Sequence, residues 1–115
     1  MQYQPPRKTM TLAEAVQWRE GLRRNGLRLA LANGCLDLLH RGHAEYLIAA
    51  RRPADALLVL LNSDESIREL KGPSRPICRE NDRTFLLSCF DFIDAVVIFR
   101  SSRCDREIAA LSPDV

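Results

Sequence analysis

Residues 27–43 read Leu-Arg-Leu-Ala-Leu-Ala-Asn-Gly-Cys-Leu-Asp-Leu-Leu-His-Arg-Gly-His and predict a strand, a polar loop and the start of a helix. The apolar run 27–32 is short and lies between glycine-containing turns, which is typical of a buried strand. The two histidines of the chain, His40 and His43, follow on either side of Gly42. If a helix begins at Gly42, free backbone N–H groups and the helix dipole favour an anion between the imidazoles. The stretch therefore predicts a phosphate site after a strand.

The rest of the chain continues an alternation of helices and strands. Residues 56–61 are apolar at every position, as expected of a strand covered on both faces by helices, and a third strand is expected at 94–99. Helices are expected at 11–25, where Thr11 and Glu14 form a capping box, and at 42–52, 65–70, 81–90 and 105–111. This order predicts right-handed βαβ units and a doubly wound parallel sheet in a three-layer α/β/α fold.

Length and composition limit the class of protein. The 115 residues predict a single domain, with an N-terminal helix at 11–25 and a βαβ core at 27–99. A net charge of +2 is too small for a general nucleic-acid binder, so no nucleic-acid partner is expected. The four cysteines show no C-x-x-C spacing, which argues against a zinc site or a disulfide framework. No apolar run is long enough for a signal peptide or a membrane span, so a cytoplasmic protein without membrane contact is expected.

A family resemblance rests on the histidine stretch and on four segments beyond it. Residues 33–43 resemble the N-G-x-F-D-x-x-H-x-G-H signature of the cytidylyltransferase-like nucleotidyltransferases, in the strand–loop–helix context that the motif requires. Within that family, the order and spacing resemble the adenylyltransferases that form ADP-heptose for lipopolysaccharide biosynthesis, at residues 62–64, 70–76, 82–83 and 96–99. The resemblance implies a Rossmann-like fold and transfer of a nucleoside monophosphate, AMP from ATP by preference, to a sugar 1-phosphate such as heptose 1-phosphate, with release of pyrophosphate.

The resemblance also implies roles for individual residues. The catalytic group comprises His40, His43 and Lys71; the nucleotide- or phosphate-binding group comprises Asn33, Gly34, Cys35, Gly42, Arg75 and Arg83; the substrate-binding group comprises Asp37 and Asp64. Imidazole N–H groups would donate to phosphate oxygens, Lys71 would act from a loop able to fold over the site, and Arg75 would offer a planar fork. Mg²⁺ would enter with the nucleoside triphosphate, and no metal site formed by the protein itself is expected.

Each of these residues also has a purely structural interpretation. The histidines could be polar residues at a helix start, and Lys71 and Arg75 could belong to a solvated loop. Arg83 could form a salt bridge at the start of its helix, and Asp64 could be an N-cap. Asp37 could stabilise a turn, and Cys35 is expected to serve packing.

Two departures from the family pattern leave alternatives open. Leu36 stands where the family usually has phenylalanine, at an expected packing position. After Pro-Asp-Val the family continues with a strand, a Lys-Gly-Gly-Asp segment and a Ser/Thr-rich helix start, and these do not follow Val115 here. An uncovered sheet edge is therefore expected, with a homodimer or another partner covering it. The alternative functions are a glycerol-phosphate or choline-phosphate type of cytidylyltransferase and a truncated, non-catalytic nucleotide-binding domain.

Overall fold

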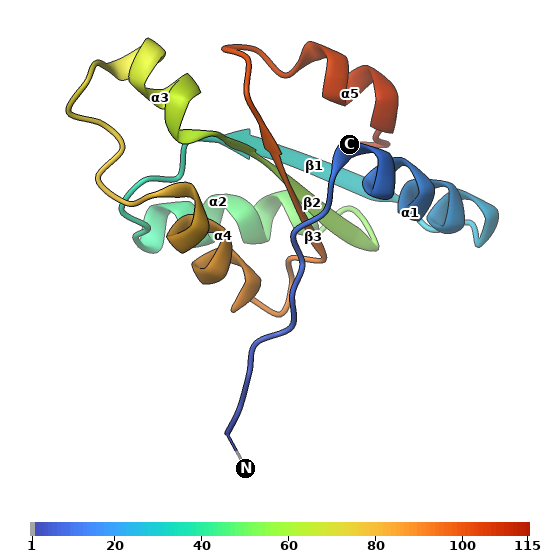
Figure 1. Cartoon of the computed structure of the whole chain (residues 1–115). Helices are drawn as coiled ribbons and strands as arrows, with labels where there is room; N and C mark the ends of the chain where they lie inside the picture. Colours follow the sequence, from blue (N-terminus) through green and yellow to red (C-terminus); the bar gives the residue numbers. More distant parts are fainter. Residues whose placement is uncertain (1) are drawn as a thin grey trace.

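Three parallel strands form the centre of the protein, shown in Figure 1 as a computed structural model that describes residues 2–115. The strands are β1 (Leu29–Gly34), β2 (Ala56–Asn62) and β3 (Ala95–Phe99), and they lie side by side in the order β1-β2-β3. In the register, Leu29 lies opposite Ala56. All residues of β2 are buried, which explains why this strand is apolar up to its final asparagine.

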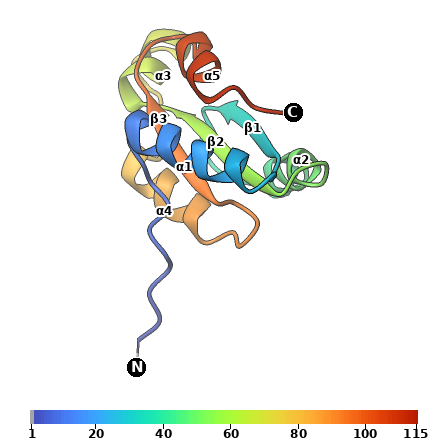
Figure 2. The same cartoon turned by 90° about the vertical axis from the view of Figure 1, so that its right-hand side faces the viewer.

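The helices cover both faces of this sheet (Figures 1 and 2). Their bounds are α1 Leu12–Arg24, α2 Arg41–Arg51, α3 Asp64–Lys71, α4 Glu80–Ser88 and α5 Asp105–Leu111. Leu47 of α2 and Leu87 of α4 pack in one core cluster, whereas Ala15 of α1 and Leu111 of α5 pack in the other. This arrangement confirms the predicted three-layer α/β/α fold.

The central strand divides its side chains between the two core clusters. Leu57, Val59 and Leu61 pack toward α2 and α4, whereas Leu58 and Leu60 pack toward α1 and α5. Successive side chains of a strand point to opposite faces, so one uninterrupted apolar run can serve two layers.

The largest difference from the sequence prediction concerns the first strand, which spans 29–34 instead of 27–32. Leu27 is 40% exposed, and its N–H donates to the carbonyl of Leu22 at the end of α1. At the other end, Asn33 and Gly34 still pair with β2. The strand therefore continues to one residue before the end of its neighbour, because cross-strand hydrogen bonds outweigh the turn preference of Asn-Gly. The capping box of α1 is confirmed, with Thr11 Oγ1 accepting from Glu14 N at 3.1 Å.

Other segments of the chain supply some backbone partners at both edges of the sheet, and the covering of an open edge by a homodimer or another partner stays a prediction. The outer edge of β3 pairs with the N-terminal segment, since Val96 N donates to Lys8 O and Met10 N donates to Val96 O. At β1, the carbonyl of Leu29 accepts from the N–H groups of Asp114 and Val115. An extended segment needs no sequence signal of its own to supply such backbone partners, which is why the pattern of the chain did not reveal this covering. Within residues 2–115, no helix combines the length and the apolar character needed to cross a bilayer.

Candidate active site

The two histidines cap the same helix end and hold each other in place. Helix α2 begins at Arg41, with His40 as its N-cap. His40 Nδ1 accepts from the N–H of Gly42 at 3.0 Å, and His43 Nδ1 accepts from the N–H of His40 at 3.2 Å. Each Nδ1 is therefore an acceptor, which leaves an Nε2–H donor on each neutral ring. The ring centroids lie 4.0 Å apart, so the histidines form a paired donor group.

The surroundings of His43 favour its neutral form. Partial burial, followed by the positive charges of His40 and Lys71, lowers the pKa of His43 below its ordinary value. Lys71 is thus close enough to act on His43, although 28 positions separate them in the sequence. A neutral imidazole near pH 7 keeps its Nδ1 available for the cap and its Nε2–H available for an oxygen of a ligand.

Gly42 is required by the ring of His40. A Cβ at this position would lie 2.8 Å from His40 Cε1 and 3.0 Å from His40 Nδ1. Its N–H donates to His40 Nδ1, so this one donor is not free for a ligand in this arrangement. The sequence predicts that the glycine allows close approach of a ligand; in the structure it makes room for the capping histidine.

Asp37 faces a second loop. Its carboxylate accepts from the N–H groups of Ile77 and Cys78, both at 2.8 Å, and Arg75 Nη1 lies 3.9 Å from it. Burial alone would raise the pKa of Asp37, but these hydrogen bonds, with the charges of Arg83 and Arg75, outweigh it and lower the pKa. The predicted contact between Asp37 and a substrate is not what this geometry favours, because both oxygens already hold the loop before α4. The turn-forming alternative is nearer to what the structure contains.

The residues on either side of Asp37 adopt an uncommon backbone conformation. Leu36 and Leu38 both have a φ of 48°, in the left-handed region. The side chain of Leu36 is 6% exposed and joins the core cluster beneath α2. The position that usually holds phenylalanine in the family is therefore a packing position here, as predicted.

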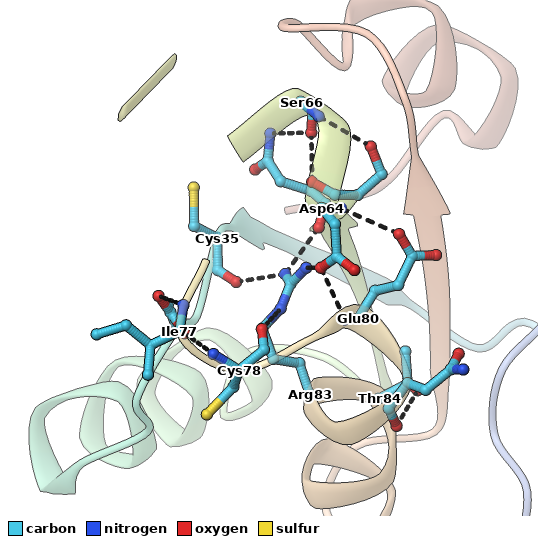
Figure 3. A network of polar contacts seen from close by, with 12 residues as sticks. Cys35, Asp64, Ser66, Ile77, Cys78, Glu80, Arg83 and Thr84 are labelled. Carbon is cyan, nitrogen blue, oxygen red and sulfur yellow. Dashed lines mark hydrogen bonds and ion pairs between the residues drawn. The ribbon is translucent and has the colours of Figure 1, made fainter. Parts of the chain in front are cut away.

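Arg83 is fully buried and lies between the strand ends (Figure 3). Its guanidinium donates to the carbonyls of Cys35 at 2.8 Å, Asn62 at 2.7 Å and Cys78 at 3.0 Å, and to Asp64 Oδ1 at 2.8 Å. In this arrangement the guanidinium of Arg83 has protein partners and its side chain reaches no surface, so the geometry does not favour the expected contact with phosphate. The salt-bridge alternative is the one the structure contains, although its burial could not be recognised from the sequence.

Asp64 is committed to the same network. It is the first residue of α3, and its neighbour Ser63 is the N-cap, so the N-cap alternative for Asp64 is off by one residue. Asp64 Oδ1 accepts from the N–H of Glu80 at 2.8 Å, and Glu80 Oε1 accepts from the N–H of Asp64 at 3.0 Å. The starts of α3 and α4 therefore cap each other, an arrangement that no local sequence signal indicates.

Lys71 and Arg75 lie on either side of the turn that follows α3. Lys71 is exposed and ends α3, so it belongs to a helix and not to the loop on which it was predicted. Arg75 is exposed as well. It lines a cavity of about 340 Å³ with the following residues: Asp64, Arg68, Pro73, Pro76 and Arg79. Arg68 and Arg79 are additions to the predicted set, and their signal in the sequence is the recurrence of arginine on both sides of the proline-containing loop.

A second cavity, of about 400 Å³, lies over the carboxyl ends of the strands, and its lining includes Leu70 of α3 and Ile108 of α5. Its polar lining includes Asn33 from β1, Asn62 from β2 and Asp105 from the start of α5. The carboxyl ends of parallel strands are where such folds bind ligands. Asn33 and Asn62 both line this cavity; the predicted contact of Asn33 with a nucleotide stays a prediction, and Asn62 is an addition to the predicted set.

Metal-binding chemistry has no side-chain basis in the part of the chain that the structure describes. Within residues 2–115, no three His, Cys, Asp or Glu side chains gather in a group that could hold a metal ion.

Comparison with known proteins identifies the family. The sequence profile described as cytidylyltransferase-like matches residues 31–115, well over half of the chain. The chain belongs to this family. The resemblance inferred from the histidine stretch is therefore confirmed, and the paired histidines occupy the start of the first helix within the matched region.

Individual family members extend this result. The bifunctional protein HldE of Helicobacter pylori strain J99 is 48% identical over 96 residues, which cover 84% of this chain and 21% of that protein. HldE of Desulfatibacillum aliphaticivorans is 41% identical over 108 residues, which cover 94% and 22%. A lipopolysaccharide core biosynthesis protein from Thermoplasma volcanium has a similar structure, with a TM-score of 0.69 and 28% identity over 77% of this chain and 71% of that one. The chain thus spans about a fifth of the length of the curated relatives.

Proposed function

We propose that this chain is a nucleotidyltransferase domain that transfers AMP from ATP to a sugar 1-phosphate of the heptose 1-phosphate type and releases pyrophosphate. The observation that carries the proposal is the reciprocal cap of His40 and His43, which uses both Nδ1 atoms as acceptors and leaves two Nε2–H donors near the charge of Lys71. Family membership supports the nucleotidyl transfer. The similarity to a lipopolysaccharide core biosynthesis protein favours an acceptor from that kind of synthesis, and the resemblance at residues 62–64 and 70–76 implies a sugar 1-phosphate.

The transfer requires that the two substrates be positioned and that the negative charge of their phosphates be neutralised. A phosphate oxygen of the acceptor attacks the α-phosphorus of ATP, a new P–O bond forms, and the bond to the β-phosphate oxygen breaks as pyrophosphate leaves. His40 and His43 donate from Nε2 to phosphate oxygens whose negative charge grows during the transfer. Lys71 adds a positive charge at the same end of the site. No side chain has to form a covalent intermediate, so Cys35 needs no role as a nucleophile.

The nucleotide would lie along the carboxyl ends of the strands. Asn33 and Gly34 end β1, Cys35 follows them, and the 400 Å³ cavity beside them offers room for part of a nucleotide. Arg75, on the rim of the arginine-lined cavity, would contact a phosphate of the nucleotide or of the acceptor. Mg²⁺ bound to the triphosphate would add charge neutralisation, with the ion held by phosphate and water oxygens.

Pyrophosphate release measured with ATP or CTP and heptose 1-phosphate tests this proposal. We expect turnover with ATP, and we expect His43→Ala to lower kcat by about 100- to 1000-fold, the cost of losing a preorganised donor. A clear preference for CTP with glycerol or choline phosphate would replace the adenylyltransferase by a cytidylyltransferase. ATP binding in calorimetry without turnover on any sugar phosphate would favour a non-catalytic nucleotide-binding domain.

A further inference from the structure

We propose that Arg83 is a positioning residue of this site, which sets the distance between the two loops that carry the phosphate-binding groups. The proposal rests on the proposed function, since it assigns to Arg83 a part in the same transfer. Arg83 touches no substrate in this scheme and acts through the backbone groups that it holds.

Four segments of the chain meet at the guanidinium of Arg83. Nη1 donates to the carbonyl of Cys35, just after β1, and to that of Asn62, the last residue of β2. Nε donates to the carbonyl of Cys78, before α4, and Nη2 donates to the carboxylate of Asp64 in α3. A guanidinium that is 0% exposed is costly unless its donors are paired, and here every nitrogen has a partner.

The backbone groups that Arg83 holds belong to the loops and strand ends of the candidate site. Cys35 begins the loop that leads to His40 and His43, and Asn62 lines the strand-end cavity. Cys78 is held on both sides, because its N–H donates to Asp37 and its carbonyl accepts from Arg83. The histidine loop, through Asp37, and Arg83 are therefore both tied to the loop that carries Arg75 at one residue, Cys78. Figure 3 shows Cys78 beside Arg83. Any displacement of the guanidinium moves both loops relative to the strand ends.

The shape of the Arg83 side chain suits this role. Four acceptors from four directions require the planar fork of arginine, whereas lysine offers one nitrogen at the end of a flexible stem. Arg83→Lys keeps the charge beside Asp64 and loses the fork. Misplacement of reacting groups by about 1 Å costs on the order of 100-fold in rate. We therefore expect Arg83→Lys to lower kcat by about 10- to 100-fold, with KM for ATP changed by less than about threefold.

The chain contains a matched control at the opposite end of the sheet. Arg19 is 3% exposed and donates to the carbonyls of Leu111 and Ser112 and to the carboxylate of Asp114. Arg19→Lys makes the same chemical change in a similarly buried arginine that holds no part of the candidate site. We expect it to lower the unfolding midpoint as Arg83→Lys does, and to leave kcat and KM within about twofold of the unsubstituted chain.

The experiment is steady-state pyrophosphate release by the unsubstituted chain and by the two lysine variants, with thermal unfolding measured on each. A loss of kcat in Arg83→Lys alone supports the positioning role. If the unsubstituted chain turns over and both variants keep its kcat, the proposed function stands and the positioning role is overturned. If the unsubstituted chain neither binds nor turns over nucleotide, the proposed function fails before any variant is compared.

A measurement on the unsubstituted chain covers the case in which Arg83→Lys does not fold. The Nε–H resonances of Arg83 and Arg19 can be followed by NMR while a non-hydrolysable ATP analogue is added. We expect the Arg83 resonance to shift together with those of His40 and His43, while the Arg19 resonance stays in place. A shift of the histidines with no shift of Arg83 would overturn the inference.

Discussion

The two buried arginines, Arg83 and Arg19, perform the same task at opposite ends of one sheet. Both donate to backbone carbonyls and to one aspartate, Asp64 at 2.8 Å and Asp114 at 3.1 Å. Every nitrogen of Arg83 has a partner, whereas Arg19 Nη1 is buried without one among residues 2–115. The Asp64 side chain is 21% exposed and that of Asp114 is 34% exposed. The carboxyl end of the sheet is therefore the more completely organised of the two.

The difference follows from the direction of a parallel sheet. At the carboxyl ends of β1 and β2 the chain leaves the sheet through loops that carry the candidate chemistry, and their backbone groups have no regular partners there. Arg83 supplies those partners. At the amino end, Arg19 fastens the end of α5 and the segment up to Asp114 against α1, which closes the fold without shaping a site. Four predictions test this comparison, in order of decreasing effect.

Removing the guanidinium of Arg83 or of Arg19 tests at which end of the sheet the loss of unfolding free energy is greater. Arg83→Met leaves three carbonyls and Asp64 without their donor, and we expect it to lower the free energy of unfolding by about 3–5 kcal/mol. Arg19→Met should lower it by less, because water can reach Asp114. Urea unfolding of both variants checks the order. An equal loss, or a greater loss for Arg19→Met, would mean that the two ends are organised alike.

Neutralising one aspartate at each end gives a smaller contrast. Asp37 accepts on both oxygens from two N–H groups, so Asp37→Asn turns an amide NH₂ toward one of them and should cost about 1–3 kcal/mol. Asp114 accepts from Leu29 N and Arg19 through Oδ2 alone, so Asp114→Asn keeps an acceptor for both and should cost less. Hydrogen exchange at Ile77 and Cys78 should accelerate only in Asp37→Asn. Unchanged exchange there would contradict the assignment of Asp37 to the loop.

Two glycine substitutions compare crowding at the two ends. In Gly21→Ala the new Cβ meets no atom within 4 Å, and we expect the helix to gain about 0.5–1 kcal/mol of stability. In Gly42→Ala the Cβ would press on the His40 ring, so the helix gain is offset by loss of the cap, and kcat should fall by about tenfold. Unfolding and pyrophosphate assays on both variants give the result. Full activity in Gly42→Ala would show that the position of the His40 ring is unimportant.

The smallest expected effect is that acid destabilises the two ends of the sheet one after the other as pH falls. Because the pKa of His43 is lowered, the folded chain binds fewer protons than the unfolded chain, so its contribution to stability is lost as pH falls below about 6.5. The hydrogen bond from Leu29 N, together with Arg19, lowers the pKa of Asp114, so that contribution is lost only as pH falls below about 3.9. NMR titration should give His43 a pKa below the ordinary value for histidine. The pKa should shift upward when phosphate binds. A midpoint at or above the ordinary value would contradict this.

Much of the fold could be predicted because its signals are local. The apolar run of β2, the capping box at Thr11 and Glu14, and the strand–loop–helix pattern around His40 each depend on residues close in the sequence. The start of β1 was misplaced because Leu27 is apolar yet lies in the turn after α1. The pairing of residues 8–10 with β3 was missed because it depends on backbone groups alone.

The sequence by itself determined the class of fold and the kind of chemistry, because hydrophobic periodicity and the spacing of His40 and His43 are properties of neighbouring residues. Only the tertiary structure decided which charged residues hold backbone groups and which stay exposed. Arg83, Asp37 and Asp64 are as polar as Lys71 and Arg75 in the sequence, yet the first three hold backbone groups from distant segments. That division depends on which carbonyls and N–H groups the strand ends leave without partners, and these are known only once the chain has folded.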